Sequence, residues 1–154
     1  MAADLGQMPE DPLPKGLEIT QVQSEQDRVL WGELAARCIG APEAVASALG
    51  QVEAGIEDCE LDGCRRYLAF HDGTPVGTAS LVLTPHVAGL YAVGTQPDQR
   101  GKGIGRALTL HALNHARHAD CRVGVLQASS MGKPLYEKLG FRTLFDYVIY
   151  VQTP

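Results

Sequence analysis

Seven consecutive residues, Arg100 to Arg106 (RGKGIGR), combine three glycines with three cationic side chains in a chain whose formal net charge is −5. A strand-type segment precedes this glycine turn and a helix-type segment follows it. The start of a helix presents unpaired N–H groups and the positive end of the helix dipole. Glycine lets a backbone approach a ligand closely, and cationic side chains suit phosphate oxygens. The turn is therefore predicted to bind a phosphate or pyrophosphate group.

The spacing of the turn narrows the class of phosphate ligand. No GxxxxGK[ST] string of the nucleoside triphosphatases occurs in the chain. A dinucleotide fingerprint, GxGxxG, would need glycine where Arg106 stands. The observed spacing is R-x-x-G-x-G, from Arg100, Gly103 and Gly105. A loop that merely tolerates glycine is a disfavoured alternative, and a dehydrogenase-type nucleotide-binding fragment is another, which predicts affinity for NAD and indifference to CoA.

Two segments together carry a family resemblance. TQPDQRGKGIGRAL resembles the pyrophosphate-binding motif of the GNAT superfamily of acyl-CoA N-acyltransferases, and SSMGKPLYEKLGF resembles its downstream helix. The spacing of the two segments and the expected strand order match that family from Leu17 onward. The resemblance implies an acetyl-CoA-dependent N-acetyltransferase of the cytoplasm, in which a primary amine attacks the thioester directly.

The resemblance also implies how acetyl-CoA binds. The two strands around the glycine-led helix separate at one end, and the pantetheine arm pairs there with backbone groups, like an added strand. The pyrophosphate rests on the N–H groups of the turn. The implied cofactor-binding residues are Val93, Gly94, Thr95, Arg100, Gly101, Lys102, Gly103, Ile104, Gly105, Arg106 and Ser129. Thr95 and Ser129 depart from the family pattern, and Ser129 has the alternative role of capping the helix that follows.

Tyr136 occupies the position of the family's general acid. Transfer of an acyl group from a thioester to an amine needs a proton for the departing thiolate. A phenol with a pKa near 10 can donate to a thiolate with a pKa of about 8.5. The alternative is an aromatic side chain that only packs at the edge of the core.

The base and the amine acceptor are not fixed by the sequence. His86, Tyr91 and Glu43 are weak candidates for the base, and a water chain would also serve. The resemblance implies an acceptor, a small molecule or a peptide amine, between residues 39–43 and residues 145–147. The alternative function is a non-catalytic acyl-CoA-binding sensor or interaction module.

Three histidines, His111, His115 and His118, share one face of the glycine-led helix. A metal pair at i and i+4 is conceivable. No third ligand is evident, and this face is expected to pack on the sheet, so histidines satisfied at the core edge are favoured. No metal is expected. The four cysteines lack CxxC spacing and are interpreted as reduced thiols.

The remaining pattern predicts one α/β domain over residues 17–154, preceded by a flexible, proline-rich tail over residues 1–16. The expected order is β-α-α-β-β-β-α-β-α-β, a mixed sheet with splayed parallel strands around a cofactor cleft. The strand signals lie at 17–22, on either side of Asp72-Gly73, at 86–93, at 122–128 and within 141–152; the helix signals begin at Ser24, Pro42, the glycine turn and Ser129.

Composition excludes several classes of function. The acidic balance argues against nucleic-acid or membrane-surface binding. No apolar run reaches the roughly 20 residues that span a bilayer, and the first residues lack the pattern of a secretory signal. A homodimer that pairs through Val148 to Val151 stays open, because an ordinary edge strand has the same pattern.

Overall fold

The protein is described by a computed structural model that covers residues 1–56, 63–148 and 150. In this part of the chain six strands form one mixed sheet in the order β1-β6-β5-β4-β3-β2. The strands are β1 (Ala2–Asp4), β2 (Leu17–Gln21), β3 (Cys64–His71), β4 (Thr74–Thr84), β5 (Val87–Thr95) and β6 (Val123–Leu126). The α-helices are α1 (Glu25–Cys38), α2 (Glu43–Ala54), α3 (Ile104–His118) and α4 (Lys133–Lys138), and the short 3-10 helices are η1 (Leu5–Gln7) and η3 (Pro97–Gln99). The α/β class is confirmed.

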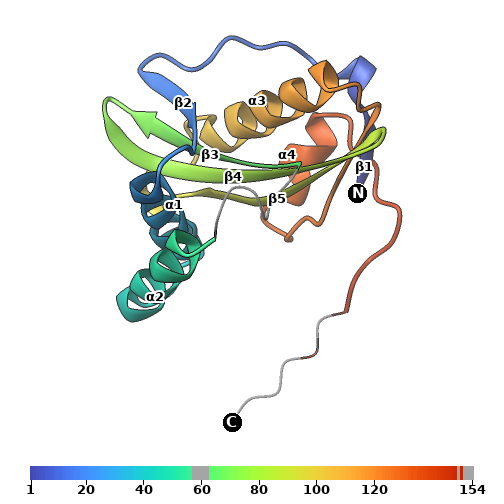
Figure 1. Cartoon of the computed structure of the whole chain (residues 1–154). Coiled ribbons are helices and arrows are strands. Elements are labelled where there is room, and N and C mark those ends of the chain that lie inside the picture. Colours follow the sequence, from blue (N-terminus) through green and yellow to red (C-terminus); the bar gives the residue numbers. More distant parts are fainter. Residues whose placement is uncertain (57–62, 149, 151–154) are drawn as a thin grey trace.

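α3 lies on one face of the sheet and α1 on the other, and α2 packs against α1 (Figure 1). The larger core joins α3 to β3, β4 and β5, and a smaller core joins α1 to Leu68 of β3. The Trp31 indole of α1 also donates a hydrogen bond to the Ala79 carbonyl of β4, at 3.2 Å. None of the described helices is long and apolar enough to cross a membrane.

Two local signals of the sequence produce the expected structure. Ser24 and Asp27 form a reciprocal capping box at the start of α1, in which each side chain accepts a hydrogen bond from the other residue's backbone N–H. These bonds hold the pKa of Asp27 below its ordinary value. Asp72 and Gly73 both adopt positive φ angles, 49° and 77°, between the paired residues His71 and Thr74. This backbone suits a two-residue hairpin turn, which joins β3 to β4.

The βαβ unit is confirmed as well. β5 and β6 are parallel, with Val87–Leu90 paired to Val123–Leu126, and α3 connects them. Parallel neighbours need a crossover connection, and α3 provides it over one face of the sheet. The first turn of α3 therefore lies just beyond the end of β5.

Two of the three histidines, His111 and His115, pack on the sheet as predicted, whereas His118 is exposed. Tyr67 of β3 is 1% exposed, and its hydroxyl lies 2.9 Å from His115 Nδ1. The His111 ring meets the Tyr67 ring edge-on, with 5.1 Å between centroids. Burial is the main cause that lowers the pKa of both histidines and raises the pKa of Tyr67 to about 12. His118 instead pairs with the Asn114 carbonyl near the end of the helix.

This packing predicts a loss of stability in mild acid. The pKa values of His111 and His115 lie below the ordinary 6.5 in the folded state, so below pH 6.5 the unfolded chain binds more protons. The stability that depends on neutral His111 and His115 is therefore fully present above pH 6.5, and it is lost as the pH falls through their folded pKa values. We expect the melting temperature to drop between pH 7.5 and 5.5, and a His111→Gln, His115→Gln variant to show a shallower drop. His118→Gln is the matched control, and a double variant with the wild-type slope would contradict the assignment.

The N-terminal segment differs from the expected tail. Ala2–Asp4 pairs antiparallel with Val123–Val125 of β6, and Leu5 is 1% exposed in the larger core. Leu5 fits there because β6 has glycine at position 124, where a methyl group would lie 2.9 Å from Leu5 Cδ2. A three-residue edge strand is too short to show alternation in the sequence, which explains the difference. The domain boundary at residue 17 stays a prediction.

The end of the chain also differs from expectation. Beyond α4, only Arg142 forms an isolated bridge, to Ala2, and residues 143–148 and 150 form no strand. β1 pairs with the edge of β6, where a further strand would otherwise add. The final strand is therefore wrong over the described residues, while residues 149 and 151–154 of the expected segment lie outside them.

Candidate functional site

The splayed pair of strands is present. β6 pairs with β5 only as far as Leu90, whereas β5 continues to Thr95. The pairing of β4 with β5 also shifts register between Thr78 and Ser80, where Ala92 of β5 has a φ of 47°. Thr78 Oγ1 donates to the Ala92 carbonyl at 3.0 Å and holds this irregular backbone. Val93, Gly94 and Thr95 thus lie beyond the last residue that pairs with β6.

Three elements meet at Gly105, in the first turn of α3. A methyl group on Gly105 would lie 3.7 Å from Thr95 Oγ1, at the end of β5, and 3.6 Å from Leu135 Cδ2, in α4. Both distances are ordinary van der Waals contacts, so the ends of β5 and α4 lie directly beside the first turn of α3. The predicted strand, turn and downstream helix are therefore brought to one place.

The glycine turn has a backbone that suits an anion. Gly101 and Gly103 both have a φ of 81°, in the left-handed region that favours glycine. Gly103 is the N-cap of α3 and offers no side chain to accept from the first N–H groups of the helix. These N–H groups need another acceptor, and a phosphate oxygen is one that helix N-termini commonly bind.

The three cations of the turn all have partners within the chain. Arg100 donates to the carbonyls of Cys38, at 2.9 Å, and Thr95, at 3.3 Å. Lys102 donates to Gln99 Oε1 at 2.7 Å. Arg106 forms an ion pair with Asp11. Two of these partners, Cys38 and Asp11, could not be expected from local sequence because they are 62 and 95 residues from the cations they bind.

Arg100 links the turn to α1. Cys38 is the last residue of α1, and its carbonyl is among those that a helix leaves without an internal partner. A cation at this end also suits the helix dipole. Gly94 packs against the same residue, since a methyl group there would lie 2.6 Å from Cys38 Cβ. Burial raises the pKa of the Cys38 thiol to about 11, so it stays protonated at neutral pH.

Tyr136 lies in α4 and is 7% exposed. Its ring meets Phe141 edge-on, at 5.8 Å between centroids, and Gly132 leaves room for it. Burial raises the pKa of its phenol above the ordinary 10. The group is therefore a protonated donor throughout the neutral range.

Ser129 closes the turn that leads into α4. Its Oγ accepts from Gly132 N at 3.2 Å, and its carbonyl accepts from Lys133 N at 2.9 Å. Ser129 thus stabilises the turn before α4 and does not cap the helix itself, whose N-cap is Gly132 without a side-chain cap bond. A cofactor contact by Ser129 stays a prediction.

The candidate bases are not gathered at the splay. His86 precedes β5 at its other end, seven residues from Val93, or roughly 23 Å along an extended strand. Glu43 is exposed and paired with Arg37 at 2.6 Å, and this bond lowers the Glu43 pKa. Tyr91 follows the last residue of β5 paired with β6 and is 47% exposed. Of the three, Tyr91 alone lies at the start of the unpaired stretch.

The sequence matches the family model described as the acetyltransferase (GNAT) family over residues 34–141. It is 30% identical over 152 residues to the mycothiol acetyltransferase of Thermomonospora curvata, covering 96% of this chain and 51% of that protein. It is 39% identical over 77 residues to the glucosamine 6-phosphate N-acetyltransferase of Trypanosoma brucei brucei, covering 46% and 52%. The chain spans about half the length of the mycothiol acetyltransferase, and the match to the Trypanosoma enzyme takes in about half of each chain.

Solved structures show the same architecture. An acetyltransferase from Trypanosoma brucei is similar with a TM-score of 0.66 and 26% identity, over 89% of this chain and 99% of that one. A predicted acetyltransferase from Clostridium acetobutylicum, solved with acetyl-CoA, has a TM-score of 0.67 at 18% identity, over 88% and 96%. The second likeness shows a shared fold.

Proposed function

Because the chain belongs to the GNAT family of acetyltransferases, we propose that it transfers an acetyl group from acetyl-CoA to a primary amine. The observation that carries this proposal is the meeting of β5, the first turn of α3 and α4 around Gly105. In this proposal β5 would take the pantetheine arm, the first turn of α3 would take the phosphates, and α4 carries Tyr136 next to the Leu135 that approaches Gly105. The chain is thus an acyltransferase by family, and its own reaction is the proposal.

The cofactor would lie across the splay. Its pantetheine arm would pair with β5 at Val93 and Thr95, as an added strand does. Its pyrophosphate would bind the N–H groups from Gly101 to Arg106, at the positive end of α3. The amine would then attack the thioester carbon and lose a proton to a base or a water chain, and the C–S bond would break. Tyr136 would donate its proton to the departing thiolate and would regain one from solvent.

The acceptor is proposed to be a small-molecule amine, in keeping with the names of the curated relatives. We place it between residues 39–43 and residues 145–147. Ile39 is 82% exposed, and Phe145 and Tyr147 are exposed with their rings 5.1 Å apart. Both segments expose apolar side chains, and their joint role as an acceptor site rests on the family resemblance alone. A peptide amine, a homodimer and a cytoplasmic location stay predictions from the sequence.

Cofactor binding is tested by thermal unfolding with acetyl-CoA, CoA, NAD and ATP, followed by calorimetry. A ligand at 100 times its dissociation constant adds about 2.7 kcal/mol to the free energy of unfolding. For a chain of this size that raises the melting temperature by roughly 5 to 10 °C. We expect a rise with the two CoA compounds and none with NAD. A rise with NAD alone, or none with CoA, would contradict the proposal.

A further inference from the structure

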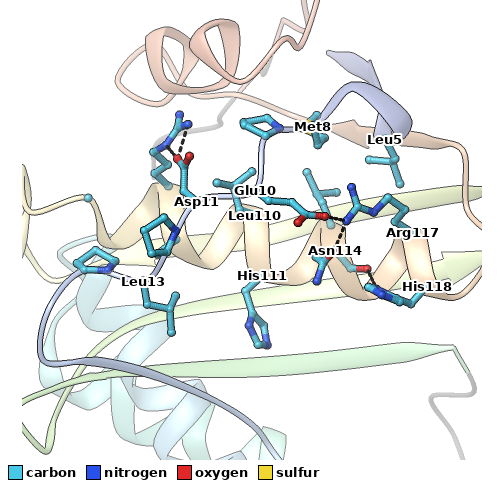
Figure 2. A pocket seen from close by; sticks show the side chains of 17 residues that line it. Leu5, Met8, Glu10, Asp11, Leu13, Leu110, His111, Asn114, Arg117 and His118 are labelled. Atoms are coloured by element: carbon cyan, nitrogen blue, oxygen red, sulfur yellow. Dashed lines mark hydrogen bonds and ion pairs between the residues drawn. The ribbon is translucent and has the colours of Figure 1, made fainter.

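The N-terminal segment crosses the outer side of α3 between η1 and β2 (Figure 2). A cavity of about 490 Å³ lies between this segment and the helix. Two ion pairs join the segment to α3: Asp11 binds Arg106 and Glu10 binds Arg117. The segment is therefore attached at two separate turns of one helix.

The Asp11 attachment lies at the glycine turn. Arg106 Nη2 and Nε both approach Asp11 Oδ2 to 2.6 Å. Pro14, three residues further on, packs toward Gly103, since a methyl group on Gly103 would lie 3.6 Å from Pro14 Cγ. The segment thus contacts two residues of the turn that is proposed to hold the cofactor phosphates.

Arg106 differs from the other cations of the turn in the charge of its partner. Arg100 and Lys102 donate to neutral oxygens, of backbone carbonyls and of the Gln99 amide. Arg106 donates two N–H groups, from Nε and Nη2, to the Asp11 carboxylate. The same edge of the guanidinium would also suit a phosphate. While the Asp11 carboxylate is bound to this edge, it opposes the binding of a phosphate to the same guanidinium.

We propose that Asp11 is an internal anion of the cofactor site: in the free protein it occupies the Arg106 guanidinium that a phosphate of CoA takes in the complex. This inference rests on the proposed use of acetyl-CoA. Cofactor binding then separates Asp11 from Arg106. The Glu10–Arg117 pair, 11 residues or roughly 16 Å further along α3, keeps the segment attached.

The direct test is titration of CoA into the wild type, Asp11→Asn and Glu10→Gln by calorimetry. The Asp11–Arg106 pair is partly exposed, with 41% and 34% of the two side chains accessible. Exposed pairs are weak, so we expect Asp11→Asn to bind CoA about two- to five-fold more tightly. Glu10→Gln loosens the same segment away from the turn and should bind as the wild type does.

The same substitution in an Arg106→Gln protein distinguishes competition for Arg106 from a change in the N-terminal segment itself. In an Arg106→Gln protein the contested cation is absent, so adding Asp11→Asn should leave CoA affinity unchanged. Unchanged or weaker binding by Asp11→Asn alone, an equal gain in Glu10→Gln, or a gain that persists without Arg106 would each overturn the role of Asp11. A wild type that does not bind CoA would overturn the proposed function together with this inference.

Discussion

Replacement of Tyr136 by phenylalanine is expected to lower kcat by about 10²- to 10⁴-fold, the usual contribution of a general acid. Affinity for acetyl-CoA should change little, because phenylalanine keeps the ring that meets Phe141 edge-on. The variant removes only the phenolic proton. The measurement is steady-state turnover with an amine acceptor, together with calorimetry of acetyl-CoA binding.

Tyr150→Phe is the matched control, since Tyr150 is 91% exposed and the same atom is removed. It should retain the wild-type kcat. Retention of kcat within a few-fold by Tyr136→Phe would show that another group protonates the thiolate. A wild type that binds acetyl-CoA but turns over no amine would favour the acyl-CoA-binding module instead.

The pH dependence of kcat is an independent test of Tyr136 as the general acid. Burial raises the pKa of Tyr136 above 10, so its proton is present across the neutral range. Loss of this acid should appear as a fall in kcat only above pH 10, and the Tyr136→Phe variant should lack that fall. An alkaline limb centred well below pH 10 would belong to another group.

Replacement of Gly94 by alanine is expected to destabilise the junction between β5 and α1. The added methyl group would lie 2.6 Å from Cys38 Cβ, closer than real side chains approach, and 3.2 Å from its Sγ, which is a tight contact. Overpacking of this kind costs about 1–3 kcal/mol. For a chain of this size the melting temperature should fall by roughly 3 to 10 °C, measured by calorimetric unfolding.

Gly105→Ala is the matched control for the added methyl group. At that position the methyl would make ordinary contacts, at 3.6 and 3.7 Å. Gly105 is the second residue of α3 and its φ is not positive, so alanine costs no backbone strain there and this variant should be about as stable as the wild type. If Gly94→Ala unfolded at the wild-type temperature, the close packing of Gly94 on Cys38 would be excluded.

The local elements of the fold could be predicted because their causes lie within a few residues. The Ser24–Asp27 capping box and the Asp72-Gly73 hairpin each depend on neighbours in the chain. The βαβ unit follows from the alternation of strand and helix patterns around the glycine turn. Two elements could not be predicted from local pattern. β1 is only three residues long, and the apolar segment after α4 has strand-type residues although its described part forms no strand.

Residue types and spacing are enough to predict that a glycine turn and a helix follow a strand, and they show which family has the same motif. The contacts of the cations follow only from the folded chain: Arg106 pairs with Asp11, 95 residues away, and Arg100 with the Cys38 carbonyl, 62 residues away. Backbone conformation at a turn depends on residue type and immediate neighbours. The partner of a long cationic side chain depends instead on which distant segment the fold lays beside it.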